Sequence, residues 1–296
     1  MSVDDPLPEL NDDASTSAEH VGASSWRRTT TFVILLVVSI AILVPLYWMV
    51  ATSLKPENLV GLFPPNFVPA KPTLAPYLNA LDQGSWGTWF FNTIVISVGT
   101  TVLTLAIALP AAYALARKEF PGAKPLYVLF LGILMIPAQI LLIPLYVLFV
   151  KLHLVNTRLG LMLAYATFFL GFSVFLLHSF FTNLPQNLED AARVGGISEW
   201  KIFLRIVLPL AKPGLATTGV FLFVFTWNEF LFALTFLQGK AMYTISVGLR
   251  VFQGNHNTVL YNQLFAMSTL STIPVILVFA YFSEEFIQGI AGLELQ

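Results

Sequence analysis

The sequence predicts an all-α integral membrane protein with six transmembrane helices and both termini in the cytoplasm. The chain of 296 residues is 56% hydrophobic and 10% charged, whereas soluble domains carry about 25% charged residues. The apolar residues also gather in long runs without charges, and a run of about 20 such residues spans a bilayer as a helix. Backbone groups in lipid must be satisfied within their own segment, so each run should be helical.

The first 28 residues are predicted to form a disordered, acidic, cytoplasmic tail. Residues 1–25 contain six acids and no Lys or Arg, and they offer too little apolar surface to offset the entropy of ordering. Residues 29–55 should form the first transmembrane helix, with its apolar run over Phe32–Leu54. That run is longer than the apolar core of a signal peptide, so we expect it to be retained.

Five further apolar runs and one proline-rich segment complete the order of elements. The segment 56–88 is expected to be an external loop, because proline at its density interrupts helices. Inside the runs, prolines 110, 137, 144 and 274 should kink the helices, and Ala108, Ala111, Ala112 and Ala116 should allow close helix contact. The predicted spans are Trp89–Ala116, Pro125–Val150, Leu159–Thr182, Gly214–Leu237 and Leu260–Ser283.

The orientation follows from the positive charges in the loops, which are enriched on the cytoplasmic side. With the N-terminus inside, nine Lys and Arg residues lie on the cytoplasmic side and six lie outside. The cytoplasmic nine are Arg27, Arg28, Arg117, Lys118, Lys124, Arg193, Lys201, Arg205 and Lys212. This orientation places the loop 183–213 in the cytoplasm.

A polar segment, Pro185–Pro213, interrupts the apolar chain before the last two spans. Asn187 is predicted to cap a short helix, in which Glu189 and Arg193 have the i, i+4 spacing of an ion pair. Gly195 and Gly196 should end that helix, and Ser198 should cap a second one. On pattern alone the segment is either an amphipathic connector on the lipid headgroups or a surface that fits another protein's groove.

The spacing within this segment resembles the EAA signature of binding-protein-dependent ABC importer permeases. That signature is E-A-A, three residues, G, nine residues, then I-x-L-P; here it is matched by Asp190-Ala191-Ala192, Gly196 and Ile206-Val207-Leu208-Pro209. Two positions depart from it, since Asp190 replaces a glutamate and Gly195 stands where aspartate is common. The stretches AAYALARKEFPGAK (111–124), LPQNLEDAARVGG (184–196), LPLAKPGLAT (208–217) and FTWNEFLFAL (225–234) resemble carbohydrate-uptake permeases, above all the shorter six-span subunit of maltose-type transporters.

The resemblance implies a type I ABC importer permease fold, with its core over residues 87–289 and a coupling loop at 183–213. Such a chain would sit in the cell membrane of a prokaryote and form half of the path for a sugar or sugar-like solute. Its partners would be a second permease subunit, two ATPase subunits that bind ATP and Mg, and an external solute-binding protein, with no nucleic acid. The residues expected at the ATPase interface are Glu189, Asp190, Ala191, Ala192, Arg193, Gly196, Ile206, Leu208 and Pro209.

A second candidate site lies within the membrane, where ionisable side chains are expensive and therefore functional candidates. Glu229 stands in the fifth predicted span beside Trp227 and Asn228, and Gln139 stands in the third. These four residues could line the substrate path. Glu229 could equally tie two helices together.

Several functions are disfavoured by what the sequence lacks. It contains no cysteine, its four histidines are scattered, and no metal site or bound cofactor is expected. No G-x-x-x-x-G-K-[ST] loop occurs, so the chain is not expected to hydrolyse ATP itself. An ion-coupled secondary transporter would show internal repeats and several buried charges, and a membrane enzyme would show clustered His, Asp or Glu. A permease for a non-sugar solute such as glycerol phosphate stays open.

Overall fold

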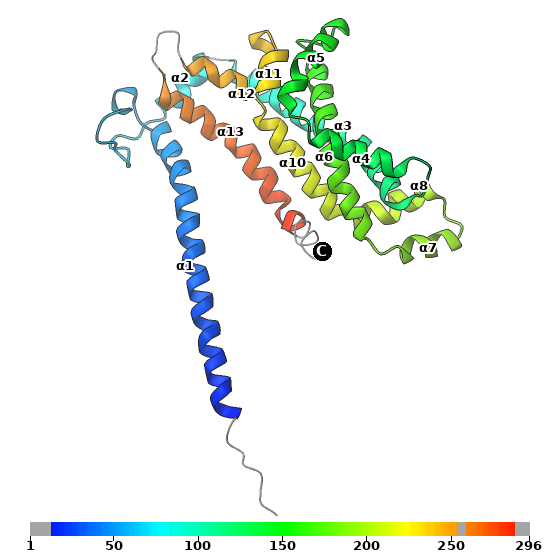
Figure 1. Ribbon diagram of the computed structural model, residues 1–296. Coiled ribbons are helices and arrows are strands. Elements are labelled where there is room, and N and C mark those ends of the chain that lie inside the picture. Colours follow the sequence, from blue (N-terminus) through cyan, green and yellow to red (C-terminus); the bar gives the residue numbers. More distant parts are fainter. Residues whose placement is uncertain (1–12, 84, 254–258, 288–296) are drawn as a thin grey trace, which may run out of the picture.

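The computed structural model describes residues 13–83, 85–253 and 259–287, and within these ranges all regular structure is helical (Figure 1). The longer helices are α1 (Asp13–Ser53), α2 (Ala75–Gln83), α3 (Trp86–Arg117), α4 (Ala123–Leu134), α5 (Ala138–Lys151), α6 (Arg158–Asn183), α7 (Asn187–Val194), α10 (Lys212–Asn228) and α13 (Tyr261–Tyr281). The shorter ones are η1 (Glu57–Leu59), α8 (Glu199–Ile202), the π-helical turn η2 (Phe203–Val207), α9 (Leu208–Leu210), α11 (Leu231–Phe236), η3 (Lys240–Met242), α12 (Ile245–Gly248) and η4 (Leu249–Gln253).

The centre of the fold is the packing of α3 against α6, and α10 packs against both of these helices. Ala108 and Ala112 of α3 are fully buried in one cluster with Val174, Leu177 and Phe181 of α6. Small side chains such as alanine let two helix backbones approach closely, and in lipid this close packing replaces the hydrophobic effect as a source of helix association. The predicted close contact around Ala108 and Ala112 is therefore confirmed.

Four of the predicted spans are confirmed as helices long and apolar enough to cross a membrane. Within the described ranges these are Trp26–Ser53 of α1, Trp86–Arg117, Arg158–Asn183 and Tyr261–Tyr281. Two more helix pairs reach that length and composition only if each bent pair counts as one span. The start of α1, α7 and the last turn of α13 lie toward one end of the molecule, and α2, α11 and α12 lie toward the other (Figure 1).

The third predicted span, Pro125–Val150, is not one kinked helix. It is two helices, α4 and α5, which meet at an angle of 101°. The break falls at Pro137, whose backbone is extended (φ −60°, ψ 128°). Proline lacks the N–H donor and disfavours helical backbone in the residue before it. Pro110, Pro144 and Pro274 instead lie inside continuous helices.

The fifth predicted span, Gly214–Leu237, is also broken. Helix α10 ends at Asn228 and α11 begins at Leu231. Glu229 between them has extended backbone (φ −66°, ψ 132°). The prediction of a continuous span here was wrong, because the Glu229 side chain takes the place of helix hydrogen bonds, as described below.

The N-terminal segment differs in part from the predicted disordered tail over 1–28. Residues 1–12 lie outside the described ranges, but α1 already begins at Asp13. Alanine and glutamate in this stretch favour helix, and extending an existing helix costs far less than nucleating one. Along its apolar part α1 is exposed, and it contacts the rest of the molecule mainly through α13.

Candidate functional site

The polar segment 185–213 folds into α7, a tight turn, and the short helices α8, η2 and α9. Helix α7 begins at Asn187, so the predicted cap is one residue off: the capping position is Gln186, and its side chain makes no capping hydrogen bond. The glycine pair ends the helix as predicted. Gly196 has φ +74°, a conformation that costs residues with a Cβ about 1–2 kcal/mol.

Several apolar side chains of this segment are exposed. Val194 is 90% exposed and Trp200 is 62% exposed. Large apolar side chains that are exposed close together often mark an interaction site. After the interface that the sequence predicts in this segment, we use the name docking face for six exposed residues: Leu188, Asp190, Ala191, Val194, Ile197 and Trp200. Asp190 and Ala191 are among the predicted interface residues, and the exposed residues Leu188, Val194, Ile197 and Trp200 are not. The available signal was that these apolar residues stand in an otherwise polar segment.

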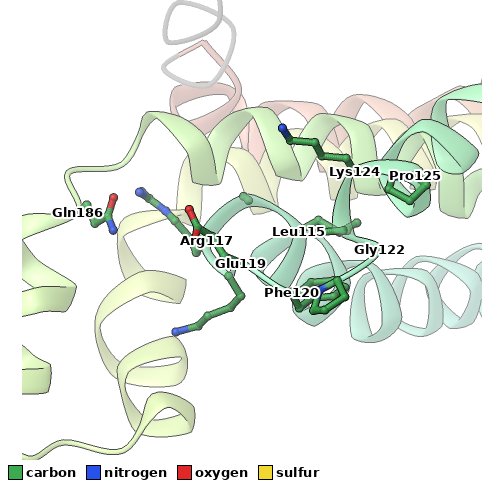
Figure 2. A pocket seen from close by; sticks show the side chains of 12 residues that line it. Leu115, Arg117, Glu119, Phe120, Gly122, Lys124, Pro125 and Gln186 are labelled. Carbon is green, nitrogen blue, oxygen red and sulfur yellow. The ribbon is translucent and has the colours of Figure 1, made fainter.

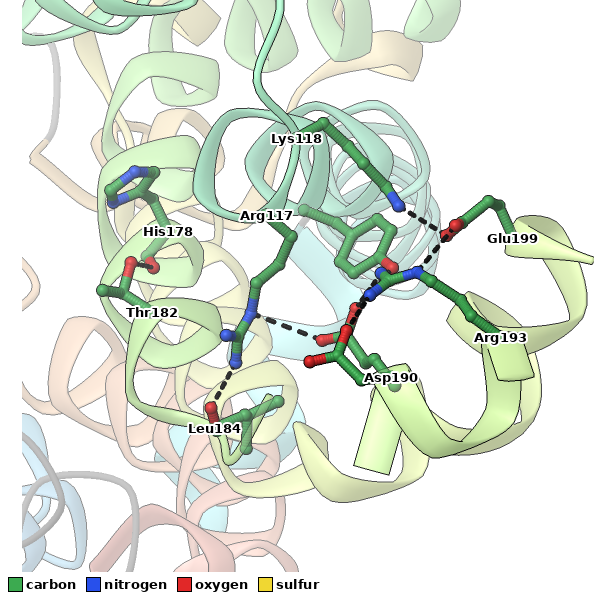
Figure 3. Close-up of polar contacts among 10 residues, drawn as sticks. Arg117, Lys118, His178, Thr182, Leu184, Asp190, Arg193 and Glu199 are labelled. Atoms are coloured by element: carbon green, nitrogen blue, oxygen red, sulfur yellow. Dashed lines mark hydrogen bonds and ion pairs between the residues drawn. The ribbon is translucent and has the colours of Figure 1, made fainter. Parts of the chain in front are cut away.

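The other side of α7 is buried against its own subunit. Glu189 and Ala192, both expected at the ATPase interface, are 2% and 9% exposed. The carboxylate of Glu189 accepts hydrogen bonds from the Tyr113 hydroxyl (2.9 Å) and from Arg193 Nη2 (3.0 Å), and Arg117 Nε lies 3.4 Å away as an ion pair. Arg117 also donates to the carbonyl oxygen of Leu184 (Figure 3). Glu189 is thus placed inside the subunit and not on the docking face, because α3 supplies its partners.

Arg193 holds three carboxylates at once. Its guanidinium bonds to Glu189 (3.0 Å), Asp190 (2.6 Å) and Glu199 (2.8 Å), while Lys118 bonds to Glu199 at 2.5 Å (Figure 3). The predicted Glu189–Arg193 pair is therefore present. The hydrogen bond with Glu199 is the main cause of a raised Arg193 pKa, and hydrogen bonds from Arg193 and then Lys118 lower the pKa of Glu199. The donors of Arg193 are engaged within the chain, so this arginine shapes the segment more than it offers a free charge.

The I-x-L-P part of the signature fastens the segment to the bundle. Ile206 and Leu208 are half-buried and Pro209 is exposed. Between them Val207, together with Phe203, is buried in the same cluster as α3 and α6. The turn thus anchors the docking face before α10 begins, and the helix axis bends by 75° between Leu210 and Lys212.

A cavity of about 900 Å³ lies beside α7, between the turn that joins α3 to α4 and Gln186 (Figure 2). Arg117, Lys118 and Lys124 line it together with Glu119. Apolar side chains, among them Leu115, Ala116 and Phe120, line the cavity beside these charges, so its wall is mixed in character.

The residues predicted for the substrate path are dispersed. Gln139 lies exposed in the first turn of α5. Trp227 is buried, and its indole N–H donates to Ser271 O of α13 at 3.1 Å. The exposed Asn228 bonds back to Val224 O of its own helix. The geometry brings Trp227, Asn228 and Glu229 to the break after α10 and leaves Gln139 on a different helix.

Glu229 caps α11 from the break between α10 and α11. Its Oε1 accepts from Phe232 N (2.9 Å), and its Oε2 accepts from Ala233 N (3.0 Å) and from the Tyr165 hydroxyl of α6 (2.5 Å). Its carbonyl oxygen accepts from Ser246 at 2.7 Å. Both carboxylate oxygens are therefore occupied inside the chain, which favours the helix-tying alternative over a sugar ligand.

Comparison with known proteins agrees with this architecture. The family model for the binding-protein-dependent transport system inner membrane component matches residues 105–290. The diacetylchitobiose uptake system permease protein NgcG of Streptomyces coelicolor is 30% identical over 263 residues, covering 88% of this chain and 87% of that protein. The trehalose/maltose transport system permease protein MalG of Thermococcus litoralis is 32% identical over 259 residues, covering 87% and 92%.

A solved structure shares the fold. It is that of a bacterial ABC transporter involved in the import of the acidic polysaccharide alginate, which matches with a TM-score of 0.76 at 22% identity and covers 94% of this chain and 100% of that chain. The predicted resemblance to ABC importer permeases is confirmed. The chain belongs to the family of binding-protein-dependent transport system inner membrane components.

Proposed function

We propose that this chain is one of the two permease subunits of an ATP-driven importer for a sugar or sugar-like solute. It forms half of the translocation path and receives the force of ATP hydrolysis through the docking face. The same proposal puts α7 and both termini on the cytoplasmic side.

The observation that carries the proposal is a set of exposed apolar side chains on a segment, α7 to α8, whose buried side chains are bonded to α3. Val194 and Trp200 are exposed, while Glu189 and Ala192 on the opposite side are buried. Exposed apolar side chains with a polar surround are typical of a protein–protein interface. The bonds to α3 hold this segment in one conformation before a partner binds. Less conformational entropy is then lost on binding, which favours affinity.

The proposed solute class, a sugar, rests on the relatives and is compatible with aromatic rings in the helices. Two relatives are named as permeases for diacetylchitobiose and for trehalose and maltose. Partly exposed aromatic rings, which suit the apolar faces of sugars, line the inner helices: Phe225 of α10 is 46% exposed and stacks on Phe169 of α6 at 5.8 Å. Aromatic packing alone would give the same picture, so the choice of a sugar depends on the relatives.

The proposed partners are a second permease subunit, two cytoplasmic ATPase subunits that bind ATP and Mg, and an external solute-binding protein. The chain lacks a P-loop, so ATP-driven import requires the ATP-binding site of another subunit. Closure of the ATPases would displace the docking face and exchange inward-facing and outward-facing states of the helices.

Substitutions at Gly196 test the proposal. A Cβ at Gly196 would meet no other atom of the chain within 4 Å, but the residue has φ +74°. Gly196→Ala should cost the subunit about 1–2 kcal/mol of backbone strain, whereas Gly196→Trp adds a side chain that can collide only with a partner or bend the turn. Gly195→Ala is the matched control, since Gly195 has φ −72°.

We expect the ATPase subunits to co-purify with the wild type and Gly195→Ala, weakly with Gly196→Ala, and not with Gly196→Trp. Membrane insertion of all three variants should match the wild type. Normal ATP-dependent uptake by Gly196→Trp would contradict the assignment of this segment as the docking site.

A further inference from the structure

We infer that Glu189 is a positioning residue that locks α7 to the end of α3, so that α3 carries movements of the docking face to the opposite end of the subunit. The inference rests on the proposed function and adds a route by which the docking face reaches residues 239–245. It also gives a physical role to the stretch 111–124, which carries Tyr113 and Arg117.

The joint at the docking end is buried and heavily bonded. The side chains of Glu189 and Arg117 are only 3% and 6% exposed. Glu189 meets the Tyr113 hydroxyl at 2.9 Å, and the Tyr113 ring packs on Phe181 of α6 and on Phe203 of η2. The carboxylate therefore sits where α3, α6, α7 and η2 converge.

The charges at this joint balance within the subunit. Three acids, Glu189, Asp190 and Glu199, are paired with three bases, Arg117, Lys118 and Arg193. Two of these bases belong to the end of α3: Arg117 is its last residue, and Lys118 follows it directly. Of these pairs Arg117–Glu189 is buried at both partners. A buried ion pair adds little net stability compared with apolar packing, and its attested use is to fix one geometry. The geometry fixed here is the angle between α7 and α3.

The opposite end of α3 is bonded just as closely to the segment 239–245. The bonds are Trp89 Nε1 to Lys240 O (2.7 Å), Asn92 Nδ2 to Ala241 O (2.9 Å) and Tyr243 O (3.0 Å), and Ile245 N to Thr93 Oγ1 (2.8 Å). Asn92 is in turn held by Arg158 Nε at 2.8 Å. Helix α3 is thus bonded through side chains at both of its ends.

Helix α3 is suited to transmit displacement over this span. It has 32 residues, which corresponds to about 48 Å at 1.5 Å per residue. It runs unbroken through Pro110, whereas the path from α7 through α10 meets a 75° bend and then the break at Glu229. Helices α4, α5 and α6 separate α3 from α7 along the chain. The polar link between the two helices is the Glu189 joint, and Ala192 of α7 adds an apolar contact in the same buried cluster as Ala112 of α3.

A distance measurement between spin labels tests the lock. The chain contains no cysteine, so Gln186→Cys at the start of α7 and Gly87→Cys at the far end of α3 can be labelled alone. Gln186 is exposed and outside the docking face, and a Cβ at Gly87 meets nothing within 4 Å. The labels are measured in the complete transporter, co-expressed with its partner subunits, without nucleotide and with trapped ATP.

In the otherwise native complex we expect one narrow distance that is the same in both nucleotide states. Glu189→Gln should broaden it or make it change with nucleotide, and should lower solute imported per ATP several-fold while the ATPase still co-purifies. Tyr113→Phe keeps the packed ring, removes only the hydroxyl, and should show the same effect in weaker form. If the complex with Glu189→Gln does not assemble, the distance and transport measured for Tyr113→Phe decide whether the inference holds.

The matched control is Glu119→Gln, which removes an exposed acid near the same end of α3 that forms no ion pair among the described residues. It should behave as the wild type. A distance that shifts with ATP in the wild type, or variants of Glu189 and Tyr113 with unchanged distances and transport, would overturn the inference. A wild-type complex that neither hydrolyses ATP nor imports solute would instead overturn the proposed function.

Discussion

Removing the Glu229 carboxylate should destabilise the protein, because this side chain holds the break between α10 and α11. Three donors converge on it: Phe232 N, Ala233 N and the Tyr165 hydroxyl. Glu229→Ala leaves all three without this acceptor, at about 1–3 kcal/mol for each group that stays buried. The expected loss is therefore roughly 3–6 kcal/mol when partial rehydration is allowed for.

Two milder variants calibrate this value. Glu229→Gln keeps one carbonyl oxygen and loses the charge, and should cost about half as much, roughly 2–3 kcal/mol. Tyr165→Phe removes one donor and leaves Glu229 with both backbone partners, and should cost about 1–2 kcal/mol. The three variants thus form a graded series at one site.

The assay is the apparent melting temperature of the purified transporter in detergent, measured with ATP-driven uptake on the same preparations. The melting temperature should fall in the order wild type, Tyr165→Phe, Glu229→Gln, Glu229→Ala. An unchanged melting temperature for Glu229→Gln, combined with lost uptake or a raised KM for solute, would refute the capping role. That pattern would mean that Glu229 binds the transported molecule.

Two further predictions concern packing and pH. Gly248→Ala should lower the melting temperature through overpacking of about 1–3 kcal/mol, since its Cβ would lie 2.2 Å from the buried Trp89 ring, whereas Gly87→Ala, with open space around it, should not. The paired Glu199 has a pKa below its ordinary value of 4.5, so its stabilising contribution is present above pH 4.5 and is lost as the pH falls through the lowered value. A nitroxide on Lys201→Cys should gain mobility in that acidic range, and Glu199→Gln should abolish the step; a step that survives this substitution would rule out Glu199 as its source.

The sequence predicted most of the helices because apolar length is a local property. The predicted span Trp89–Ala116 differs from α3 by only a few residues at its start and one at its end. The sequence could not show that the run Pro125–Val150 bends by 101°. A proline marks where a helix can break, but the angle between the two halves depends on what each half packs against. The break at Glu229 was hidden for a related reason: one of its partners, Tyr165, lies 64 residues away in the chain.

The candidate site was predicted in its position and in part of its chemistry. The spacing of the EAA-like residues located α7 and its glycine turn, and the Glu189–Arg193 pair followed from helical periodicity. Which side of α7 faces outward could not be read, because burial of Glu189 depends on Tyr113 and Arg117 from a distant helix. As a result the predicted interface residues include the buried Glu189 and leave out the exposed Val194 and Trp200.

The central claim, that this chain imports a solute with energy from partner ATPases, is tested most directly in proteoliposomes. The complete complex is reconstituted with its solute-binding protein, and accumulation of labelled diacetylchitobiose, trehalose and maltose is measured with and without ATP. We predict accumulation of at least one sugar that requires both ATP and the binding protein and persists when ion gradients are collapsed. Accumulation that proceeds without ATP and stops when the ion gradient is collapsed would contradict the account.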